Sequence, residues 1–355
     1  MRSRTWLVSV VFTAMALMLT LITAKGAPTD EELLKTAQQI FGPLPTNMAD
    51  PGLPFTAALI ELGRKLFFDP RVSVDGTVSC ARCHQSALYG TDGLPKPRGA
   101  HDRENPRNSP TVLNAALQFT AHWRGDRVNV EDQAQQALIG PASFGNPSYE
   151  AAMNRLKGIP GYVELFAKAF PNDRDPITPK NWGQAIGAFE RTLVTPSRFD
   201  DYLRGDVGAL SPQERNGLQL FINTGCIACH NGPGIGGNTF QKFGVYEDYW
   251  KATGVAHPDA GRFDVTKDAN DRYVFKVPSL RNVAMTPPYF HDGSVRALPD
   301  AVRIMARVQL NQQLSDSDIQ EIVAFLSSLT GNLPQTFVES PTLPASAFDN
   351  EDAEQ

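Results

Sequence analysis

A five-residue pattern, Cys-x-x-Cys-His, occurs twice in this chain, as CARCH at residues 80–84 and as CIACH at residues 226–230. The chain has four cysteines, and all four lie within these two copies. No cysteine is therefore left over for a bond elsewhere. This repeat constrains the fold more than any other feature, because each copy must place two thiols and one imidazole where they act together.

The pattern is the attachment motif for c-type haem, in which two thiols form thioethers and the adjacent histidine ligates the iron. A zinc site and a thioredoxin-like redox pair are the alternatives. A histidine directly after the second cysteine does not fit zinc-finger spacing, and a redox pair needs neither that histidine nor a second copy. We therefore predict two covalently bound haem c groups, held by Cys80, Cys83 and His84 and by Cys226, Cys229 and His230.

The first 26 residues indicate export. Two arginines precede an apolar run from Trp6 to about Ala24, and small residues and then acids follow it. This order is typical of a secretory signal peptide, although the run is also long enough for an uncleaved membrane anchor. We expect a periplasmic protein, associated with the membrane only if residues 1–26 are retained.

The composition leaves room for two domains and excludes one class of partner. The chain has 355 residues, of which 41% are hydrophobic, and its formal net charge is −5. Length and apolar content of this size are sufficient for two packed cores. Because an acidic chain without a basic run is a poor ligand for nucleic acid, we expect no nucleic acid partner.

The residues after each motif show that the chain is an internal duplication. SPTVLNAALQFTAHWRG (109–125) aligns without gaps to VPSLRNVAMTPPYFHDG (277–293), and the matched pairs are Pro110 and Pro278, Asn114 and Asn282, Ala116 and Ala284, and Gly125 and Gly293. Such a repeat predicts two copies of one structural unit. We expect a mainly α fold of two tandem cytochrome c-like domains, residues 27–195 and 196–335, followed by an extended tail, residues 336–355.

Two helices are predicted in the second copy. The first is predicted to begin at Ser211, a suitable N-cap that forms a capping box with Glu214. Pro212 suits the first helical position, and Gly225 ends the helix. The stretch SDSDIQEIVAFLSSLTG carries an apolar stripe of helical spacing that closes at Gly331. Since no stretch alternates apolar and polar residues over a useful length, we expect no substantial sheet.

The copies differ in a possible second haem ligand. Met305 lies twelve residues after Gly293, whereas Ala137 lies twelve residues after Gly125. A methionine closes the sixth position of the iron and raises its potential. We therefore expect Met305 to ligate the second haem, with Met285 as the alternative. In the first copy His101, in a polar loop, and His122, which aligns with Phe290, are the nitrogen candidates.

Several longer stretches resemble the bacterial di-haem cytochrome c peroxidase family, which includes MauG-type protein-modifying enzymes. They are LGRKLFFDPRVS, PRNSPTVLNA, HWRG and GRFDVTKDANDRYVFKVPSLRNVAMTPPYFHDGSV, and they recur in the right order over roughly residues 50–335. The resemblance implies a peroxidatic first haem and an electron-transferring second haem that has Met305 as ligand. MauG-type enzymes have a tyrosine at that position, so the methionine favours the peroxidase branch.

The resemblance also implies roles for individual residues and partners. His101 matches a loop histidine that leaves the peroxidatic iron on activation, Trp123 matches a tryptophan between the haems, and Gln133 matches a polar residue near the peroxidatic site. A calcium ion would be bound by Asn108 and by the carbonyls of Thr286 and Pro288. The implied partners are hydrogen peroxide, a small cytochrome c or cupredoxin as donor, and a second copy of the chain.

One departure from the family concerns proton transfer. The family has a catalytic glutamate where this chain has Ser143 or Phe144, and Glu150, the nearest carboxylate downstream, is out of register. An acid–base group of this kind contributes about 10²–10⁴-fold to a rate. Three functions therefore remain: a peroxidase, a MauG-like oxidase that modifies an aromatic residue of a partner protein, and a non-enzymatic electron carrier or sensor.

Overall fold

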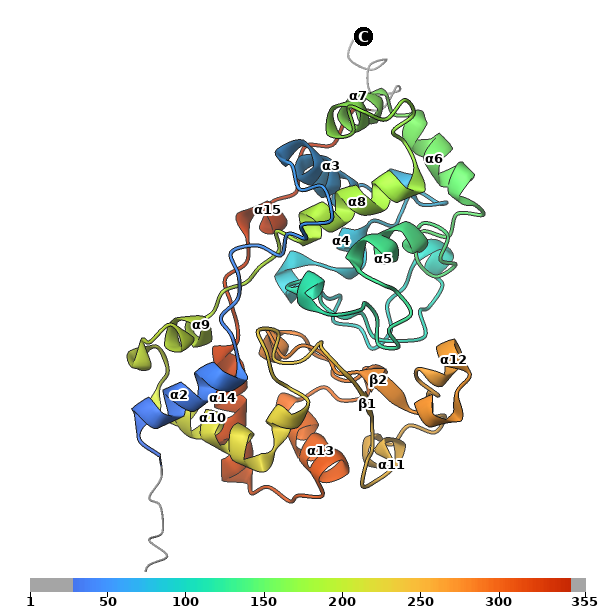
Figure 1. Ribbon diagram of the computed structural model, residues 1–355. Helices are drawn as coiled ribbons and strands as arrows, with labels where there is room; N and C mark the ends of the chain where they lie inside the picture. Colours follow the sequence, from blue (N-terminus) through green and yellow to red (C-terminus); the bar gives the residue numbers. More distant parts are fainter. Residues whose placement is uncertain (1–27, 346–355) are drawn as a thin grey trace, which may run out of the picture.

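The computed structural model describes residues 28–345, which form two mainly helical lobes (Figure 1). The first lobe contains α3 (Ala57–Phe68), α4 (Cys80–Cys83), α5 (Val130–Ala137), α6 (Tyr149–Lys157), α7 (Pro160–Ala169) and α8 (Pro179–Glu190). The second contains α9 (Arg198–Leu203), α10 (Pro212–Thr224), α11 (Tyr249–Thr253), α12 (Phe263–Thr266), α13 (Leu298–Leu310) and α14 (Asp316–Ser328). The predicted architecture of two tandem, mainly α domains is confirmed.

A crossed pair of helices forms the centre of each lobe. α3 packs on α8 in the first lobe, and α10 packs on α14 in the second. Each crossing contains a glycine: a Cβ on Gly63 would overlap the carbonyl of Ala185, and a Cβ on Gly217 would overlap the carbonyl of Glu321. The backbones can approach this closely only because both positions lack a side chain. The central helix pairs of the two lobes therefore cross in the same way.

The two helices predicted in the second copy are present. α10 begins at the Ser211 cap, whose side chain accepts a hydrogen bond from the Glu214 amide, and it ends at Gly225, which has a φ of 94°. The left-handed conformation suits glycine and turns the chain directly into the second haem motif. α14 begins at the Ser315 cap and keeps Ile319, among others, in the core.

The matched asparagines of the duplication meet at one residue. Asn114 and Asn282 both have left-handed backbones, with φ values of 56° and 63°. Each side-chain amide donates to the same hydroxyl oxygen, Oγ1 of Thr195, at 2.8 Å in both cases. All three residues are buried. The two copies are therefore joined at a shared polar contact in the interior.

The ends of the described chain cross over between the lobes. α2 (Asp30–Ile40) places Leu33 and Ala37 in the core of the second lobe. At the other end α15 (Gln335–Val338) places Phe337 in the core of the first lobe. The tail predicted as extended from residue 336 thus begins in a helix, and the segment from residue 28 belongs to the second core, although the predicted boundary grouped it with the first.

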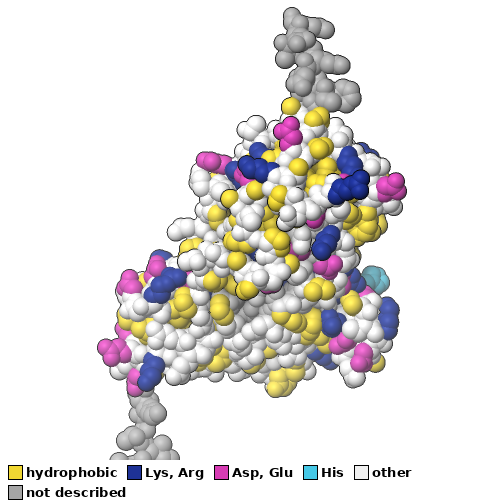
Figure 2. Space-filling model, turned by 45° about the horizontal axis from the view of Figure 1, so that its top comes forward, with side chains coloured by type: hydrophobic (Ala, Val, Ile, Leu, Met, Phe, Trp, Pro, Cys, Tyr) yellow, Lys and Arg dark blue, Asp and Glu magenta, His cyan; other side chains and the backbone are white. Residues whose placement is uncertain are grey.

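The remaining structure is short. β1 (Phe240–Lys242) and β2 (Val274–Lys276) pair antiparallel in the second lobe, in the register Gln241 to Phe275. Within residues 28–345 no helix is both long and apolar enough to cross a membrane. The signal-peptide prediction concerns residues that lie outside the described part of the chain. Figure 2 shows positive and negative side chains interspersed on the face that it displays.

Candidate haem sites

The first motif forms one helical turn that positions its histidine. α4 spans Cys80–Cys83, and the amide of His84 donates to the carbonyl of Cys80. Nδ1 of His84 lies 2.9 Å from the carbonyl oxygen of Gly90. Loss of solvent around the ring lowers the pKa of His84 to about 4. A neutral imidazole that uses Nδ1 for a carbonyl leaves Nε2 as the lone-pair donor for a metal.

The second motif repeats this arrangement. A short 3-10 helix, η6 (Cys226–Ala228), follows Gly225, and the amide of His230 donates to the carbonyl of Cys226. Nδ1 of His230 lies 3.3 Å from the carbonyl oxygen of Ile235, and burial lowers the pKa of His230 to about 4. Both motifs therefore present a neutral histidine that is oriented by a backbone carbonyl, as a haem iron requires.

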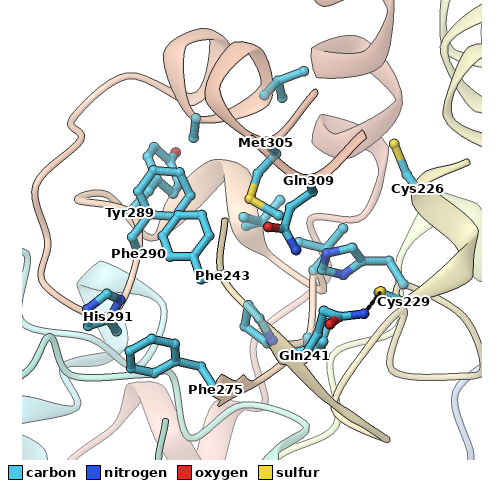
Figure 3. Close-up of a pocket in the computed structure, with 18 of the residues that line it drawn as sticks. Cys226, Cys229, Gln241, Phe243, Phe275, Tyr289, Phe290, His291, Met305 and Gln309 are labelled. Carbon is cyan, nitrogen blue, oxygen red and sulfur yellow. Dashed lines mark hydrogen bonds between the residues drawn. The ribbon is translucent and has the colours of Figure 1, made fainter. Parts of the chain in front are cut away.

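A cavity of about 430 Å³ opens beside the second motif. Cys226, Cys229 and His230 line it, and Met305 reaches into it from α13 (Figure 3). Its remaining lining is mostly apolar and aromatic, including Phe243, Phe275 and Phe290. The walls suit a large flat hydrophobic group, and the two thiols, the imidazole and the thioether are the donor set of a c-type haem. These residues fit the group that the sequence predicts.

The rival methionine lies elsewhere. Met285 is in η8 (Val283–Met285), is 42% exposed, and borders a separate hollow beside Pro287 and Pro288. It is not among the residues that line the cavity of Cys226 and His230. Of the two candidates considered from the sequence, Met305 is thus the one that shares a cavity with the second motif.

Trp123 connects the two lobes at the same cavity. Its indole Nε1 donates to the carbonyl of Asn108 at 2.9 Å, and its own carbonyl accepts from the amide of Lys276 at 2.7 Å. The ring packs against the aromatic cluster around Phe243, which Met305 also contacts. Trp123 is therefore held between first-lobe and second-lobe backbone, and its position between the haems remains a prediction.

The residues predicted to bind calcium border the same large cavity, and the calcium site stays a prediction. Asn108, Thr286 and Pro288 all line the cavity, although Asn108 lies far from the other two in the sequence. Amide and carbonyl oxygens suit a hard cation. Among the described residues there is no group of three or more His, Cys, Asp or Glu side chains that could hold a metal ion. A cation at Asn108 would therefore depend on neutral oxygen ligands.

His101 is directed away from the interior. It lies in η3 (Ala100–Asp102) with a φ of 55°, and its side chain is 53% exposed. Its amide donates to Oδ2 of Asp75 at 2.7 Å, and its Nδ1 lies 3.7 Å from the same oxygen. His122 instead lies 3.4 Å from Asp126. His101 is therefore not buried against the first motif in this conformation, whereas His122 lines the cavity and, after burial, also contributes to the lowered pKa of His84.

Comparison with known proteins identifies the family. The family described as di-haem cytochrome c peroxidase matches residues 57–208, and the cytochrome c family matches residues 214–330. The chain is 43% identical over 312 residues to the cytochrome c551 peroxidase of Pseudomonas aeruginosa, covering 87% of this chain and 89% of the relative. The chain belongs to the di-haem cytochrome c peroxidase family.

Other relatives fall on both branches of the family. The cytochrome c551 peroxidase of Nitrosomonas europaea is 42% identical, with 83% of this chain and 86% of the relative covered. MauG of Methylorubrum extorquens is 34% identical, with 78% and 79% covered. A solved MauG-like protein associated with microbial copper homeostasis superposes with a TM-score of 0.71 at 28% identity, covering 84% of this chain and 95% of that one.

Family membership fixes the general chemistry. The chain is a di-haem peroxidase, an oxidoreductase that acts on peroxide and carries two haem c groups. Bound haem supplies one-electron redox chemistry and an iron position that a small oxidant can occupy. The family also implies hydrogen peroxide as substrate and a cytochrome c as electron donor.

Ser143 and Phe144, which the sequence predicts to stand where the family has its glutamate, lie in a loop of the first lobe. Phe144 is 3% exposed and packs edge to face on Trp182 with ring centroids 5.7 Å apart, so it is a core residue. The carbonyl of Ser143 accepts from the amide of Ala100 at 2.9 Å, which ties this loop to the loop of His101. Gln133 is half-buried on α5, and Glu150 is exposed on α6.

Two buried ionisable residues of the di-haem peroxidase escaped the sequence analysis. Glu190, at the end of α8, is 4% exposed, and burial raises its pKa to about 8. It also raises the pKa of the Cys80 thiol, which places it near the first motif. Lys276 is 5% exposed in the cavity wall beside Gln118, and burial lowers its pKa to about 7. Glu190 belongs to no motif or periodic pattern, and Lys276, although it lies within the family-like stretch 261–295, carries no sequence signal that it is buried.

Proposed function

We propose that this chain reduces hydrogen peroxide to water in the periplasm. Electrons from a small cytochrome c or cupredoxin enter at the second haem site, pass Trp123 and reach peroxide at the first site. The position of Trp123, bonded to Asn108 of one lobe and to Lys276 of the other, supports this route. A calcium ion at Asn108, Thr286 and Pro288 would brace the same junction.

The observation that carries the proposal is the difference between Met305 and Ala137. Met305 lines the cavity of the second motif, where its thioether can close the sixth position of an iron. Ala137, at the corresponding place on α5, has no donor atom. An electron-transfer site needs a closed iron, and a peroxidatic site needs an open one, so the two copies suit the two halves of the reaction.

His101 is proposed as the gate of the first site. The bond from its amide to Asp75 holds the imidazole at the surface in this conformation. The bond between Ala100 and Ser143 makes its loop continuous with the loop where the family's glutamate would lie. Movement of the His101 loop would thus open or cover the side of the first site from which peroxide enters.

Steady-state turnover with reduced cytochrome c and peroxide tests the proposal. We expect a rate far above that of free haem, and spectra of the half-reduced protein that show one high-spin haem. A rate no better than that of free haem would rule out the peroxidase. A half-reduced spectrum without a high-spin haem would instead favour an electron carrier with His101 on the first iron.

A second candidate function follows from Ser143. Because no carboxylate occupies this place, peroxide cleavage lacks its usual proton carrier, and stored oxidising equivalents could be withdrawn by an aromatic residue of a partner protein. Ser143→Glu is expected to raise the peroxidase rate by about 10²-fold, the lower end of the range for an acid–base group. Ser143→Gln, which has similar size but no titratable proton, is the control. Peroxide-dependent modification of a co-expressed partner, measured by mass spectrometry, would support the second function.

A further inference from the structure

A continuous series of aromatic rings leads away from Trp123 into the second lobe. The ring centroid of Trp123 lies 6.3 Å from that of His291, which lies 5.2 Å from that of Tyr249. Tyr249 lies 5.2 Å from Trp250, and Trp250 lies 4.7 Å from Tyr273. Each step is a direct ring contact. Phe275 and His291 belong to the same group and are labelled in Figure 3.

The inner and outer ends of this series differ in burial. Tyr249 is fully buried and His291 is 2% exposed, whereas Trp250 and Tyr273 are only partly buried. Trp250 lies on α11, a helix that Figure 1 shows at the edge of the second lobe. The series thus runs from the cavity at Trp123 to the protein surface.

The hydroxyl of Tyr249 has a proton acceptor within reach. Its oxygen lies 3.4 Å from Nε2 of His291, and it accepts from the amide of Asp259 at 2.9 Å. Phe243 stacks on the Tyr249 ring with centroids 4.6 Å apart. The Tyr249 ring thus contacts both the oxidisable ring of Trp250 and the imidazole of His291, which in turn contacts Trp123. The hydroxyl can also donate to the carbonyl of Asp259 at 3.4 Å, so it bonds to both backbone groups of that residue.

We propose that Tyr249, Trp250 and Tyr273 form a relay that carries single oxidising equivalents from Trp123 to the surface when no electron donor is bound. The relay rests on the proposed function, since peroxide is the oxidant and Trp123 is the residue through which electrons reach the first site. The relay gives oxidising equivalents a second route out of the protein. This route either protects the haem sites from oxidation or oxidises an electron-rich molecule at Trp250 and Tyr273.

The steps balance in electrons and protons. Hydrogen peroxide takes two electrons and two protons and gives two water molecules, and Trp123 supplies one electron at a time. Oxidised Trp123 then takes one electron from Tyr249, whose O–H bond breaks as the proton passes to Nε2 of His291. Trp250 next gives one electron to the Tyr249 radical, which recovers its proton from His291. Finally, Tyr273 gives one electron to Trp250 and releases its phenolic proton to solvent.

Radical trapping in the complete haem-loaded protein tests the relay. Peroxide is added without a donor, the sample is frozen for electron paramagnetic resonance, and a parallel sample is digested for mass spectrometry. We expect an organic radical signal and oxygen addition at Trp250 and Tyr273. In Tyr249→Phe, which keeps the ring, this oxidation should fall about tenfold, corresponding to about 1.4 kcal/mol in the barrier to transfer.

Two further measurements make the outcome decisive. Tyr202→Phe removes a buried hydroxyl from the second core, away from the series, and should leave the oxidation of Trp250 unchanged. Turnover with reduced cytochrome c should be unaffected in Tyr249→Phe. The relay is overturned if turnover is normal but Tyr249→Phe does not reduce the oxidation of Trp250 and Tyr273. It is also overturned if the oxidation is found on other residues. In both cases the peroxidase proposal still stands. Absent turnover in the unmodified protein overturns the peroxidase and the relay with it, so turnover distinguishes the two failures.

Discussion

At the scale of single residues, the two halves of this chain differ by what they offer to an iron. Met305 packs on the aromatic cluster that also contacts Trp123, so its thioether lies in the wall that joins the two lobes. The equivalent alanine on α5 offers only a methyl group. If Met305 ligates the second iron as proposed, this one side chain makes the two otherwise similar haem sites unequal.

Met305→Leu tests this assignment, because leucine keeps most of the volume and removes the sulfur. We expect the second haem to lose its low-spin spectrum and its potential to fall, since methionine raises the potential of haem iron. Met285→Leu, at a position 42% exposed, should leave both unchanged. The assignment fails if the second-haem spectrum changes with Met285 and not with Met305.

Glu190 gives the first lobe a predictable dependence on pH. Its pKa is raised from 4.5 to about 8 by burial and by the nearby Glu131. The folded state therefore holds this proton more tightly than the unfolded state, and the associated stability is complete below about pH 4.5 and is lost as pH rises to 8. Each unit of that rise in pKa corresponds to about 1.4 kcal/mol.

We expect the free energy of urea unfolding to fall between pH 5 and pH 8.5 on account of this group. Glu190→Gln keeps the shape and has no proton to lose, so its unfolding free energy should vary less over the same range. Equal slopes for the two proteins would show that Glu190 is not the residue responsible.

At the scale of helices, the glycines at the two crossings set how closely the lobes can pack. Helices α10 and α14 could be predicted from the sequence, because caps such as Ser211 and stops such as Gly225 are local signals. It carried no comparable signal for the crossing itself. The closeness at Gly63 depends on a carbonyl of α8 more than a hundred residues away, and no local pattern reports such a contact.

Alanine at either crossing should be strongly destabilising. In Gly63→Ala and Gly217→Ala the added methyl group overlaps a backbone carbonyl, so we expect a cost of about 3 kcal/mol or more, the upper range for overpacking. Gly208→Ala meets only the flexible side chain of Asp206 and should change stability by less than about 1 kcal/mol. Unfolding in urea gives all three values, and a similar cost at the three sites would contradict the packing argument.

At the scale of the whole molecule, the two ends of the chain act as straps. Besides Phe337, the stretch after α15 is held by Arg64, which donates to the carbonyls of Thr336 and Glu339, and by Lys65, which donates to that of Thr342. Each lobe is thus completed by a segment that is continuous with the other lobe. The sequence predicted an extended tail from residue 336, but it did not identify the surface on which either end of the chain packs.

Phe337→Ala should loosen the first lobe although Phe337 follows the second lobe in sequence. The side chain is fully buried against Phe67, with ring centroids 6.0 Å apart, so we expect a loss of about 3–5 kcal/mol. Val338→Ala, at a position 46% exposed, is the control and should have little effect. Hydrogen exchange should show the loss in α3 and α8. Loss confined to α10 and α14 would contradict the strap.

The hydroxyl of Thr195 has a consequence for electron tunnelling. Tunnelling rates fall exponentially with distance, so thermal motion between two cofactors would spread the rate over a wide range. Because Asn114 and Asn282 are both anchored to one oxygen atom, the two halves share a fixed origin and cannot separate there without breaking two buried hydrogen bonds. In the proposed electron route, this shared contact would limit changes in the distance between the two haem sites.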